Sequence, residues 1–483
     1  MKKLLFLIFN LLFFISCYTS SPPVSYFSRD LPIPPLLEGT LINGETNYKF
    51  HVRKGKSQII EGVKTNTYGY NGNILGPTIK VRKGQNYRFK IHNNLGERTS
   101  VHWHGLRVPG EMDGGPNQMF IDGDYWEPHY KIEQPASTLW YHPHTWHKTG
   151  KHAYMGLAGL YIIEDDISDI LPIPKEYGVD DFPIIVQDKR FDRWGNLIYS
   201  NEHIDSMYGM RGDTLIVNGI FAPTLDINKK YIRLRILNGS NASNYLYSFS
   251  DNRDFYQIAT DGGFLEKSNK LKKIFLSPGE RVEIIVEFKE EDKKKDIYLR
   301  GDDTNIMKLN VMNLDKNIEK IPNTLVDFQE YDIPSNVKVR EFILEGLGHM
   351  VAINRRQINM NRVDEYVPLN NIEIWEIRNI GTSHGGMMGM RNMMGMGNNN
   401  NFTNGGKSLN GHSFHIHAVQ FRVLERNGQK PKAFEDGWKD TIFVDLEEVV
   451  RVAVKFEDKG LFMYHCHILE HEDNGMMGTF LVE

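Results

Sequence analysis

A threefold repeat of one strand pattern constrains this fold more than any other feature of the sequence. In each copy an alternating strand closes on an asparagine, and these residues, Asn93, Asn238 and Asn379, are 145 and 141 residues apart. Alternation of β-branched and aromatic residues with polar ones is typical of half-buried antiparallel strands. At ~150 residues per domain, a chain of 483 residues corresponds to three domains. The sequence therefore predicts an all-β protein of three consecutive β-sandwiches, at residues 36–170, 171–325 and 326–483.

The overall charge and the cysteine count exclude several classes of protein. Lys and Arg number 57 against 61 Asp and Glu, a formal charge of −4. The chain therefore lacks the basic footprint of a protein with a nucleic-acid partner. Two cysteines are too few for a disulfide scaffold or for a metal site built mainly from thiolates. A metal would bind mainly to imidazole, and the chain has 18 histidines.

The N-terminus has the pattern of an export signal followed by a tether. Two lysines precede an apolar run, residues 4–15, that is too short to span a bilayer as a mature helix. Residues 14–17 resemble a bacterial lipobox, so we expect residues 1–16 to be a signal peptide and Cys17 to carry a lipid. The alternative is an ordinary signal that is cleaved a few residues later. We expect a proline-rich tether at 17–35 and a location in the periplasm or cell envelope, without a transmembrane helix.

Ten of the histidines lie in four clusters, two in the first predicted domain and two in the third. Residues i and i+2 of a strand face the same side about 6–7 Å apart, so each His-x-His pair can direct two imidazoles to one site. Imidazole alone suits copper, zinc, iron or nickel. The clusters are His102-Trp103-His104, His142-Pro143-His144, His412-Ser413-Phe414-His415-Ile416-His417, and His465-Cys466-His467 with His471.

The last cluster indicates copper. Cys466, His471 and Met476 follow a C-x4-H-x4-M spacing. Together with the upstream His412 they supply two imidazoles, a thiolate and a weak thioether, which is the ligand set of a blue-copper electron-transfer site. Cys466 lies between two histidines and so faces the opposite side of its strand. Its sulfur can bind one copper while its neighbours bind others, which joins the two sites through a few covalent bonds.

The four motifs resemble those of the multicopper oxidases, a family with three cupredoxin-like Greek-key β-sandwich domains. The resemblance covers essentially all of the mature chain. In detail it is similar to the periplasmic cuprous oxidases of bacterial copper efflux. The matching segments are Val-His-Trp-His-Gly at 101–105, Pro-Gly-Glu-Met-Asp-Gly-Gly at 109–115, Met-Gly-Leu-Ala-Gly at 155–159, Gly-Trp-Lys-Asp-Thr at 437–441 and Leu-Glu-His-Glu-Asp at 469–473.

The resemblance implies four copper ions and the reduction of O₂ to water with four electrons and four protons. Asp113 and Glu472 match the family's acidic residues on the proton path; otherwise the first is a turn residue and the second a solvent-facing charge. The type 2 copper would be held by His102 and His415, the type 3 pair by His104, His142, His144, His417, His465 and His467, and the type 1 copper by Cys466, His412, His471 and Met476.

A segment rich in Met, Gly and Asn interrupts the strand pattern of the third domain. Soft thioethers select Cu(I), and the segment immediately precedes a type 1 ligand, so we expect residues 384–401 to be a loop that docks Cu(I) for oxidation. The alternative is a disordered insert or a lid over an organic substrate. Residues 408–411 lack the Asp and Met that the enterobacterial cuprous oxidases carry before the type 1 histidine, so their substrate ligands do not carry over. The candidate ligands are Met387, Met388, Met390, Met393, Met394 and Met396.

Three functions follow from these motifs. The first is a monomeric cuprous oxidase that detoxifies copper, with O₂ and either Cu(I) or a small organic reductant as partners. The second is a laccase that oxidises phenols or aromatic amines. The third is a non-catalytic copper-binding lipoprotein that uses the methionine segment alone, and the complete ligand sets argue against it. A copper nitrite reductase is disfavoured because it has two such domains and no cysteine flanked by two histidines.

Overall fold

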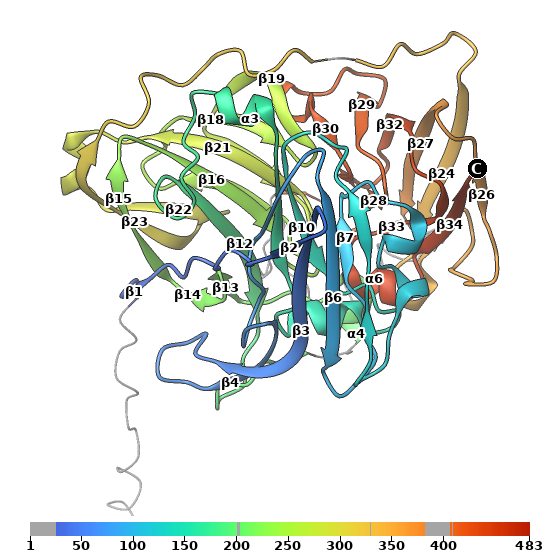
Figure 1. Ribbon diagram of the computed structural model, residues 1–483, viewed down its shortest axis with the longest axis horizontal. Coiled ribbons are helices and arrows are strands. Elements are labelled where there is room, and N and C mark those ends of the chain that lie inside the picture. Colours follow the sequence, from blue (N-terminus) through green and yellow to red (C-terminus); the bar gives the residue numbers. More distant parts are fainter. Residues whose placement is uncertain (1–25, 200–202, 329, 382–405, 408) are drawn as a thin grey trace, which may run out of the picture.

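The computed structural model describes residues 26–199, 203–328, 330–381, 406–407 and 409–483. Within these residues the strands form six sheets, which pair around three buried apolar cores, one in each third of the chain (Figure 1). The prediction of an all-β protein with three β-sandwiches is confirmed. The predicted boundaries after residues 170 and 325 fall between β11 and β12 and between β23 and β24.

The first sandwich holds the first two histidine motifs. One sheet runs in the order β2 (Thr40–Ile42), β3 (Glu45–Ser57), β6 (Asn86–Asn94), β8 (Tyr125–Trp126), with β4 (Thr65–Tyr70) paired to β3 and β9 (His129–Lys131) to β6. The other runs β5 (Ile79–Arg82), β11 (Gly159–Glu164), β10 (Ser137–His142), β7 (His102–His104).

The second sandwich has the most strands among the described residues and carries none of the predicted metal ligands. Its first sheet runs β1 (Arg29–Asp30), β15 (Pro223–Lys229), β23 (Thr304–Asp315), β22 (Ile297–Gly301), β17 (Tyr245–Phe249), β20 (Lys273–Leu276). Its second runs β14 (Ile220–Phe221), β13 (Thr214–Val217), β12 (Asp181–Lys189), β16 (Tyr231–Asn238), β21 (Arg281–Glu287), β18 (Phe255–Thr260), β19 (Gly263–Leu271). Because β1 lies within the predicted tether, part of that segment is a sheet edge of this sandwich.

The third sandwich holds the other two histidine motifs. Its sheets run β25 (Ala352–Ile353), β24 (Lys338–Glu345), β27 (Ile372–Gly381), β32 (Val449–Lys455), β29 (Phe421–Arg426), β30 (Trp438–Lys439), and β26 (Glu365–Val367), β34 (Met477–Val482), β33 (Gly460–Cys466), β28 (His412–Ile416), β31 (Thr441–Val444).

Helices in the described part of the chain are short. The described α-helices are α2 (Thr149–Tyr154), α3 (Asp166–Ile170), α4 (His203–Tyr208) and α6 (Leu469–Asp473). The 3₁₀ helices are η1 (Gly110–Met112), η2 (Pro116–Gln118), η3 (Glu290–Lys294), η4 (Gly348–Met350) and η5 (Ala433–Glu435). Over the described part of the chain, none has the length and apolar character needed to cross a membrane.

The three repeated asparagines form the same pattern of hydrogen bonds in each sandwich. All three are fully buried at the ends of β6, β16 and β27. Each side-chain oxygen accepts a hydrogen bond from the backbone N–H two residues later, and each amide donates to two backbone carbonyls. Buried polar groups must be paired, so this asparagine ties the strand end to two neighbouring segments. The sequence repeat is therefore a repeated loop junction.

The expectation of antiparallel strands is wrong for part of each sandwich. The pairs β3–β6, β12–β16 and β24–β27 are parallel. Period-2 alternation reports which face of a strand is buried and carries no information on the direction of its neighbour. The direction is decided by how the chain crosses between sheets.

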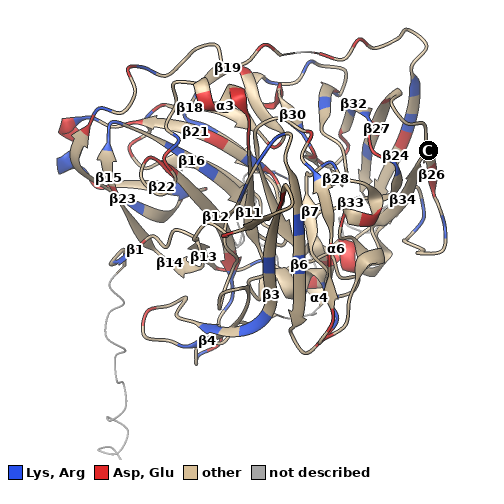
Figure 2. Cartoon of the chain, in the orientation of Figure 1, with Lys and Arg blue, Asp and Glu red and all other residues tan. Residues whose placement is uncertain are grey.

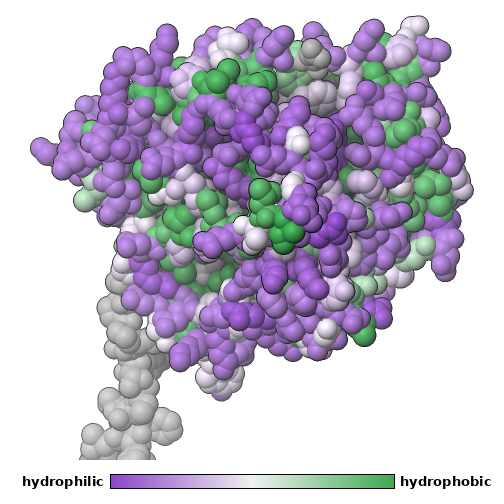
Figure 3. All heavy atoms as spheres, in the orientation of Figure 1, coloured by the Kyte–Doolittle hydropathy of each residue, from purple (hydrophilic) through white to green (hydrophobic). Residues whose placement is uncertain are grey.

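Charged and apolar residues divide between surface and core. Figure 2 shows Lys and Arg interspersed with Asp and Glu along the strands. The face drawn in Figure 3 is mostly hydrophilic, with hydrophobic residues in small separate groups. The large apolar side chains lie instead in the sandwich cores, including the fully buried Trp103, Trp140 and Trp375.

Candidate functional site

Strand register brings the four histidine motifs together in pairs. In the first sandwich β10 pairs with β7 and places His142 opposite His102. In the third, β28 pairs with β33 and places His415 opposite His465 and Phe414 opposite Cys466. Directly opposed residues in an antiparallel pair have Cβ atoms about 5 Å apart. Local pairing therefore builds half of the site on each of two sandwiches.

The two halves meet where β7 faces β28 and β33, between the first and third sandwiches (Figure 1). The rings of His104 and His415 stack with centroids 3.7 Å apart, and those of His102 and His417 with centroids 4.0 Å apart. Ligand atoms within 4.8 Å of one another form three all-histidine groups: His102, His104 and His142; His102, His415 and His417; His144, His417 and His465. The ring of His467 lies 4.9 Å from that of His104 and 5.2 Å from that of His142.

Most of these rings are oriented by a hydrogen bond from the nitrogen that points away from the cluster. Such a bond fixes the tautomer and leaves the other nitrogen as a lone pair. The Nδ1 atoms donate as follows: His102 to the Asp113 carbonyl (2.9 Å), His142 to the Pro143 carbonyl (2.8 Å), His415 to the Asp440 carbonyl (2.8 Å), His465 to the Cys466 carbonyl (3.1 Å), and His417 to Asp113 Oδ2 (2.7 Å).

The free nitrogens fit a bound metal. The Nε2 atoms of His102 and His415 are buried and have no hydrogen-bond partner. Burial lowers the pKa of His102 and of His417 to about 3, so both rings are neutral near pH 7. Neutral, unpartnered imidazoles that converge in a buried space cost free energy unless a cation accepts their lone pairs. The donor set therefore suits copper of the kind the sequence predicts.

Asp113 is buried beside two of the histidines. Its Oδ2 is 2.7 Å from His417 Nδ1, and its Oδ1 is 3.5 Å from His102 Nδ1. Burial raises the pKa of Asp113 to about 6, although the neighbouring His102 acts in the opposite direction. The carboxyl group can therefore exchange a proton near neutral pH next to the cluster.

Glu472 occupies the equivalent place on the other side of the cluster. Its Oε1 lies 3.2 Å from His144 Nδ1, and its Oε2 lies 3.3 Å from His465 Nδ1. Only 1% of the residue is exposed, which differs from a solvent-facing charge. Burial, reinforced by Asp473, raises the pKa of Glu472 well above its usual range. A buried carboxyl group is thus held between two imidazoles.

A second candidate metal site lies on the other side of β33. Cys466 Sγ is 3.5 Å from His412 Nδ1 and 3.8 Å from His471 Nδ1. The Cys466 N–H donates to the Met476 carbonyl at 3.0 Å, and Met476 is fully buried. His471 Nε2 donates to the Met207 carbonyl of α4, so the second sandwich orients this ring. His412, Cys466 and His471 of the predicted blue-copper site therefore meet at one buried place, and the buried Met476 is joined to Cys466 through the backbone.

Two residues that contact the site were not identified from the sequence. Asp440 contacts His104 and His415, and it lies in the segment 437–441 that carries the family resemblance but was given no role. Arg281 of the second sandwich binds Asp440, and no sequence motif marks it. The six candidate methionines of 384–401, and Cys17 with the signal peptide, lie outside the described residues.

Comparison with known proteins identifies related chains. Two regions match family models described as multicopper oxidase, residues 51–168 and 329–483. The multicopper oxidase mco of Staphylococcus haemolyticus is 39% identical over 440 residues, which cover 91% of this chain and 89% of that protein. The cell division protein FtsP of Proteus mirabilis is 34% identical over 478 residues, 94% of this chain and 92% of that protein. The solved laccase of Pediococcus acidilactici is 33% identical, with 94% of each chain covered and a TM-score of 0.85.

Proposed function

Because this chain belongs to the multicopper oxidase family and is an oxidase enzyme that uses copper, we propose that it oxidises Cu(I) to Cu(II) and reduces O₂ to water. Four Cu(I) ions, one O₂ and four protons give four Cu(II) ions and two waters. The observation that carries the oxidase chemistry is the position of Cys466, which faces His412 and His471. Its two neighbours, His465 of β33 and His467 directly after the strand, face the histidine cluster.

The proposed metal content is four copper ions. His102 and His415, with free Nε2 atoms, would hold the type 2 ion. The type 3 pair would be held by His104, His142 and His467 on one side and by His144, His417 and His465 on the other. Cys466, His412, His471 and Met476 would hold the type 1 ion. Bound copper would supply one-electron redox steps and binding of O₂.

The protein's own groups supply the burial and the protons. All ten histidines and Cys466 are fully buried, so bulk water is excluded from the cluster. Asp113 Oδ2 holds a proton position at His417, and Glu472 holds one at His144 and His465. Reduction of O₂ consumes protons, and burial raises the pKa of both carboxyl groups, which favours their protonated forms. We therefore assign proton delivery to these two residues.

Cu(I) is favoured as the substrate by the methionines before His412. Six of the ten residues from 387 to 396 are Met, and thioethers bind Cu(I) in preference to harder cations. Ten residues separate the segment 384–401 from β28, whose first residue, His412, is a proposed type 1 ligand. Oxidation of a phenol or aromatic amine is the second candidate, supported by the similarity to a protein named as a laccase.

The N-terminal sequence supports a cellular location for this reaction. A signal peptide at residues 1–16 and lipid attachment at Cys17 would put the enzyme in the periplasm or cell envelope, where it would act as a monomer on exported copper. Copper would then be loaded outside the cytoplasm.

The substrate is tested by O₂ uptake of the copper-loaded protein with Cu(I) or a phenol as the donor. A variant with Leu at the six methionine positions keeps the length and apolar character of the segment, and Met312→Leu, an exposed methionine of β23, is the matched control. We expect the KM for Cu(I) to rise about tenfold or more in the first variant only, a loss of ~1.4 kcal/mol of binding, with phenol oxidation unchanged.

Three results would contradict the proposal. An unchanged KM for Cu(I) removes the docking role of the methionines. Faster turnover of the phenol than of Cu(I) identifies a laccase. Copper binding without O₂ uptake from either donor leaves a copper-binding protein, a result that the similarity to a cell division protein makes worth measuring.

A further inference from the structure

The second sandwich, which carries no predicted metal ligand, reaches the histidine cluster through the turn between β20 and β21. Gly279 in this turn has a φ of +87°. A Cβ atom there would lie 3.1 Å from His467 Cδ2 and 3.2 Å from His104 Cε1. Ser413, which directly follows His412, donates to the Pro278 carbonyl at 2.9 Å. The turn is therefore packed against proposed copper ligands of both other sandwiches.

Arg281, at the end of this turn, forms a two-point ion pair with Asp440 of the third sandwich. Nη1 donates to Oδ1 and Nη2 to Oδ2, each at 2.6 Å, and both side chains are fully buried. The other Arg281 bonds fix the guanidinium itself: Nε donates to the Thr138 carbonyl, and Nη2 to the Asp261 carbonyl, each at 3.0 Å. The planar guanidinium group, fixed in this way, sets the position and the plane of the Asp440 carboxylate.

Asp440 in turn orients two proposed copper ligands. Its Oδ1 is 3.1 Å from His104 Nε2, and its backbone carbonyl accepts from His415 Nδ1 at 2.8 Å. A carboxylate accepts hydrogen bonds only, so His104 carries its proton on Nε2 and offers the Nδ1 lone pair, 3.3 Å from His142 Nε2. His415 carries its proton on Nδ1 and offers Nε2. In both rings the nitrogen that carries the lone pair faces the cluster.

The glycine of the first histidine motif makes room for this pair. Gly105 has a φ of +86°, and a Cβ atom there would lie 2.3 Å from Asp440 Oδ2 and 2.9 Å from Arg281 Nη2. The Gly105 carbonyl accepts from Gln420, which also donates to Asp440 Oδ2 at 2.9 Å. All three sandwiches thus contact one buried carboxylate.

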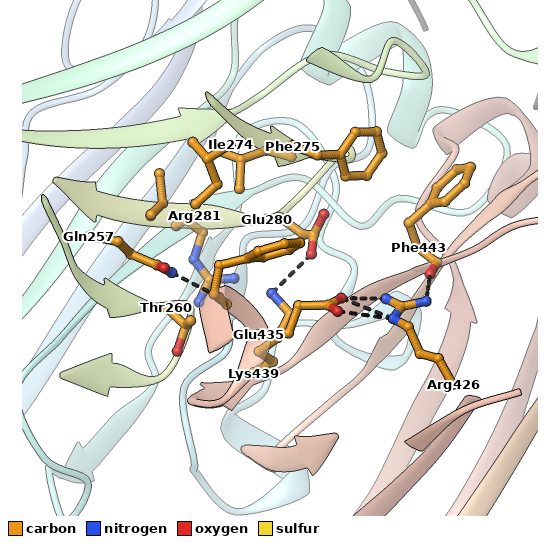
Figure 4. Close-up of a pocket in the computed structure, with 13 residues that line it drawn as sticks. Gln257, Thr260, Ile274, Phe275, Glu280, Arg281, Arg426, Glu435, Lys439 and Phe443 are labelled. Carbon is orange, nitrogen blue, oxygen red and sulfur yellow. Dashed lines mark hydrogen bonds and ion pairs between the residues drawn. The ribbon is translucent and has the colours of Figure 1, made fainter. Parts of the chain in front are cut away.

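Further buried ion pairs fix the position of the turn between β20 and β21. Lys439, adjacent to Asp440, binds Asp261 Oδ2 at 2.7 Å and Glu280 Oε1 at 2.9 Å, and Asp261 Oδ1 accepts from the Arg281 backbone N–H. Figure 4 shows Lys439 and Glu280 bonded beside Arg281, in a pocket between the second and third sandwiches. Lys439 is engaged with these two acids, so without Arg281 the Asp440 carboxylate would lose its guanidinium partner while still buried.

We infer that Arg281 is a positioning residue of the copper cluster: through Asp440 it sets the orientation of His104 and His415. The middle sandwich thereby completes a site whose ligands lie entirely in the other two. The inference rests on the proposed assignment of these histidines as type 3 and type 2 ligands. Loss of a group that orients a metal ligand typically costs 10–100-fold in metal affinity or activity.

The test compares Arg281→Met with Arg233→Met, which breaks another buried arginine–carboxylate pair in the same sheet, at Glu283. The other described side-chain contacts of Arg233 are with Asp181 and Phe264, so none of them is with a histidine. Copper per chain, the electron paramagnetic resonance signal of type 2 copper and the blue type 1 absorption are measured on copper-loaded protein. We expect Arg281→Met to lower type 2 copper affinity and O₂ reduction by about 10–100-fold, with an altered type 2 signal and intact blue absorption. Arg233→Met should keep the wild-type signals.

A conservative variant separates orientation from charge. Arg281→Lys keeps the positive charge but makes only one contact, so its type 2 signal should stay altered. A wild-type signal in Arg281→Met, equal effects in Arg233→Met, or full restoration by Arg281→Lys would each overturn the inference. Wild-type protein that binds no type 2 copper would instead refute the proposed function on which it rests.

Discussion

Replacement of Glu472 by Gln tests the proton role most directly, because the change keeps the shape of the side chain and removes only its acid. Both carboxylate oxygens face ring nitrogens, of His144 and His465, and the residue has no access to solvent that could substitute for it. Proton transfer by a positioned acid is typically worth 10²–10⁴-fold in rate, or about 2.7–5.5 kcal/mol in the barrier. Asp113 remains on the other side of the cluster, so we expect a loss near 10²-fold.

The assay is O₂ uptake of copper-loaded protein with the blue absorption recorded in parallel. Glu470→Gln is the matched control: it lies in the same helix α6 and is equally buried, but it binds Tyr199, Asn241 and the Met210 N–H instead of histidines. Glu472→Gln should slow O₂ reduction while the blue absorption stays, and Asp113→Asn in addition should slow it further. An unchanged rate refutes the proton role. A lost blue colour shows that Glu472 is structural.

Three further predictions concern the type 1 thiolate, a tight glycine and a buried lysine. Cys466→Ser should abolish the blue absorption and electron entry while the type 2 copper signal persists; a retained blue band would contradict the ligand assignment. Gly105→Ala should lower the free energy of unfolding by about 2–5 kcal/mol, from the positive φ and the clash with Asp440, as measured by denaturant unfolding. Burial lowers the pKa of Lys189 to about 7, from 10.5 in the unfolded chain. The buried ammonium group therefore destabilises the fold by its full amount below pH 7. This destabilisation decreases as the pH rises to 10.5, where the unfolded chain also loses the proton. Lys189→Met should therefore stabilise by about 1–4 kcal/mol near pH 7, and a gain that grows with pH would refute this sign.

The spacing of residues along the sequence was enough to predict the strands of this site and the side of each strand that the ligands occupy. The alternating segments closing on Asn93, Asn238 and Asn379 are β6, β16 and β27. The i, i+2 spacing of His415, in β28, and His417, directly after it, places both imidazoles on one side of the chain, because side chains alternate along an extended backbone. The residue between His465 and His467 faces away for the same reason, which the position of Cys466 shows.

Other features have no local signature. His104 contacts Asp440, which is 336 residues away, and Arg281 is 159 residues from the same carboxylate. Parallel pairing, such as β3 with β6, likewise depends on how the chain crosses between sheets.

The sequence by itself determined the three sandwiches, the strands that carry the histidines and the chemistry of the donor atoms, because these depend on residue type and on periods of two. Only the tertiary structure decided that the first and third sandwiches face each other at β7 and β28, and that Arg281 of the second closes the site. Docking between domains depends on surface shape and on the pairing of buried charges. Those pairings join residues far apart in the chain, so no pattern of neighbouring residues records them.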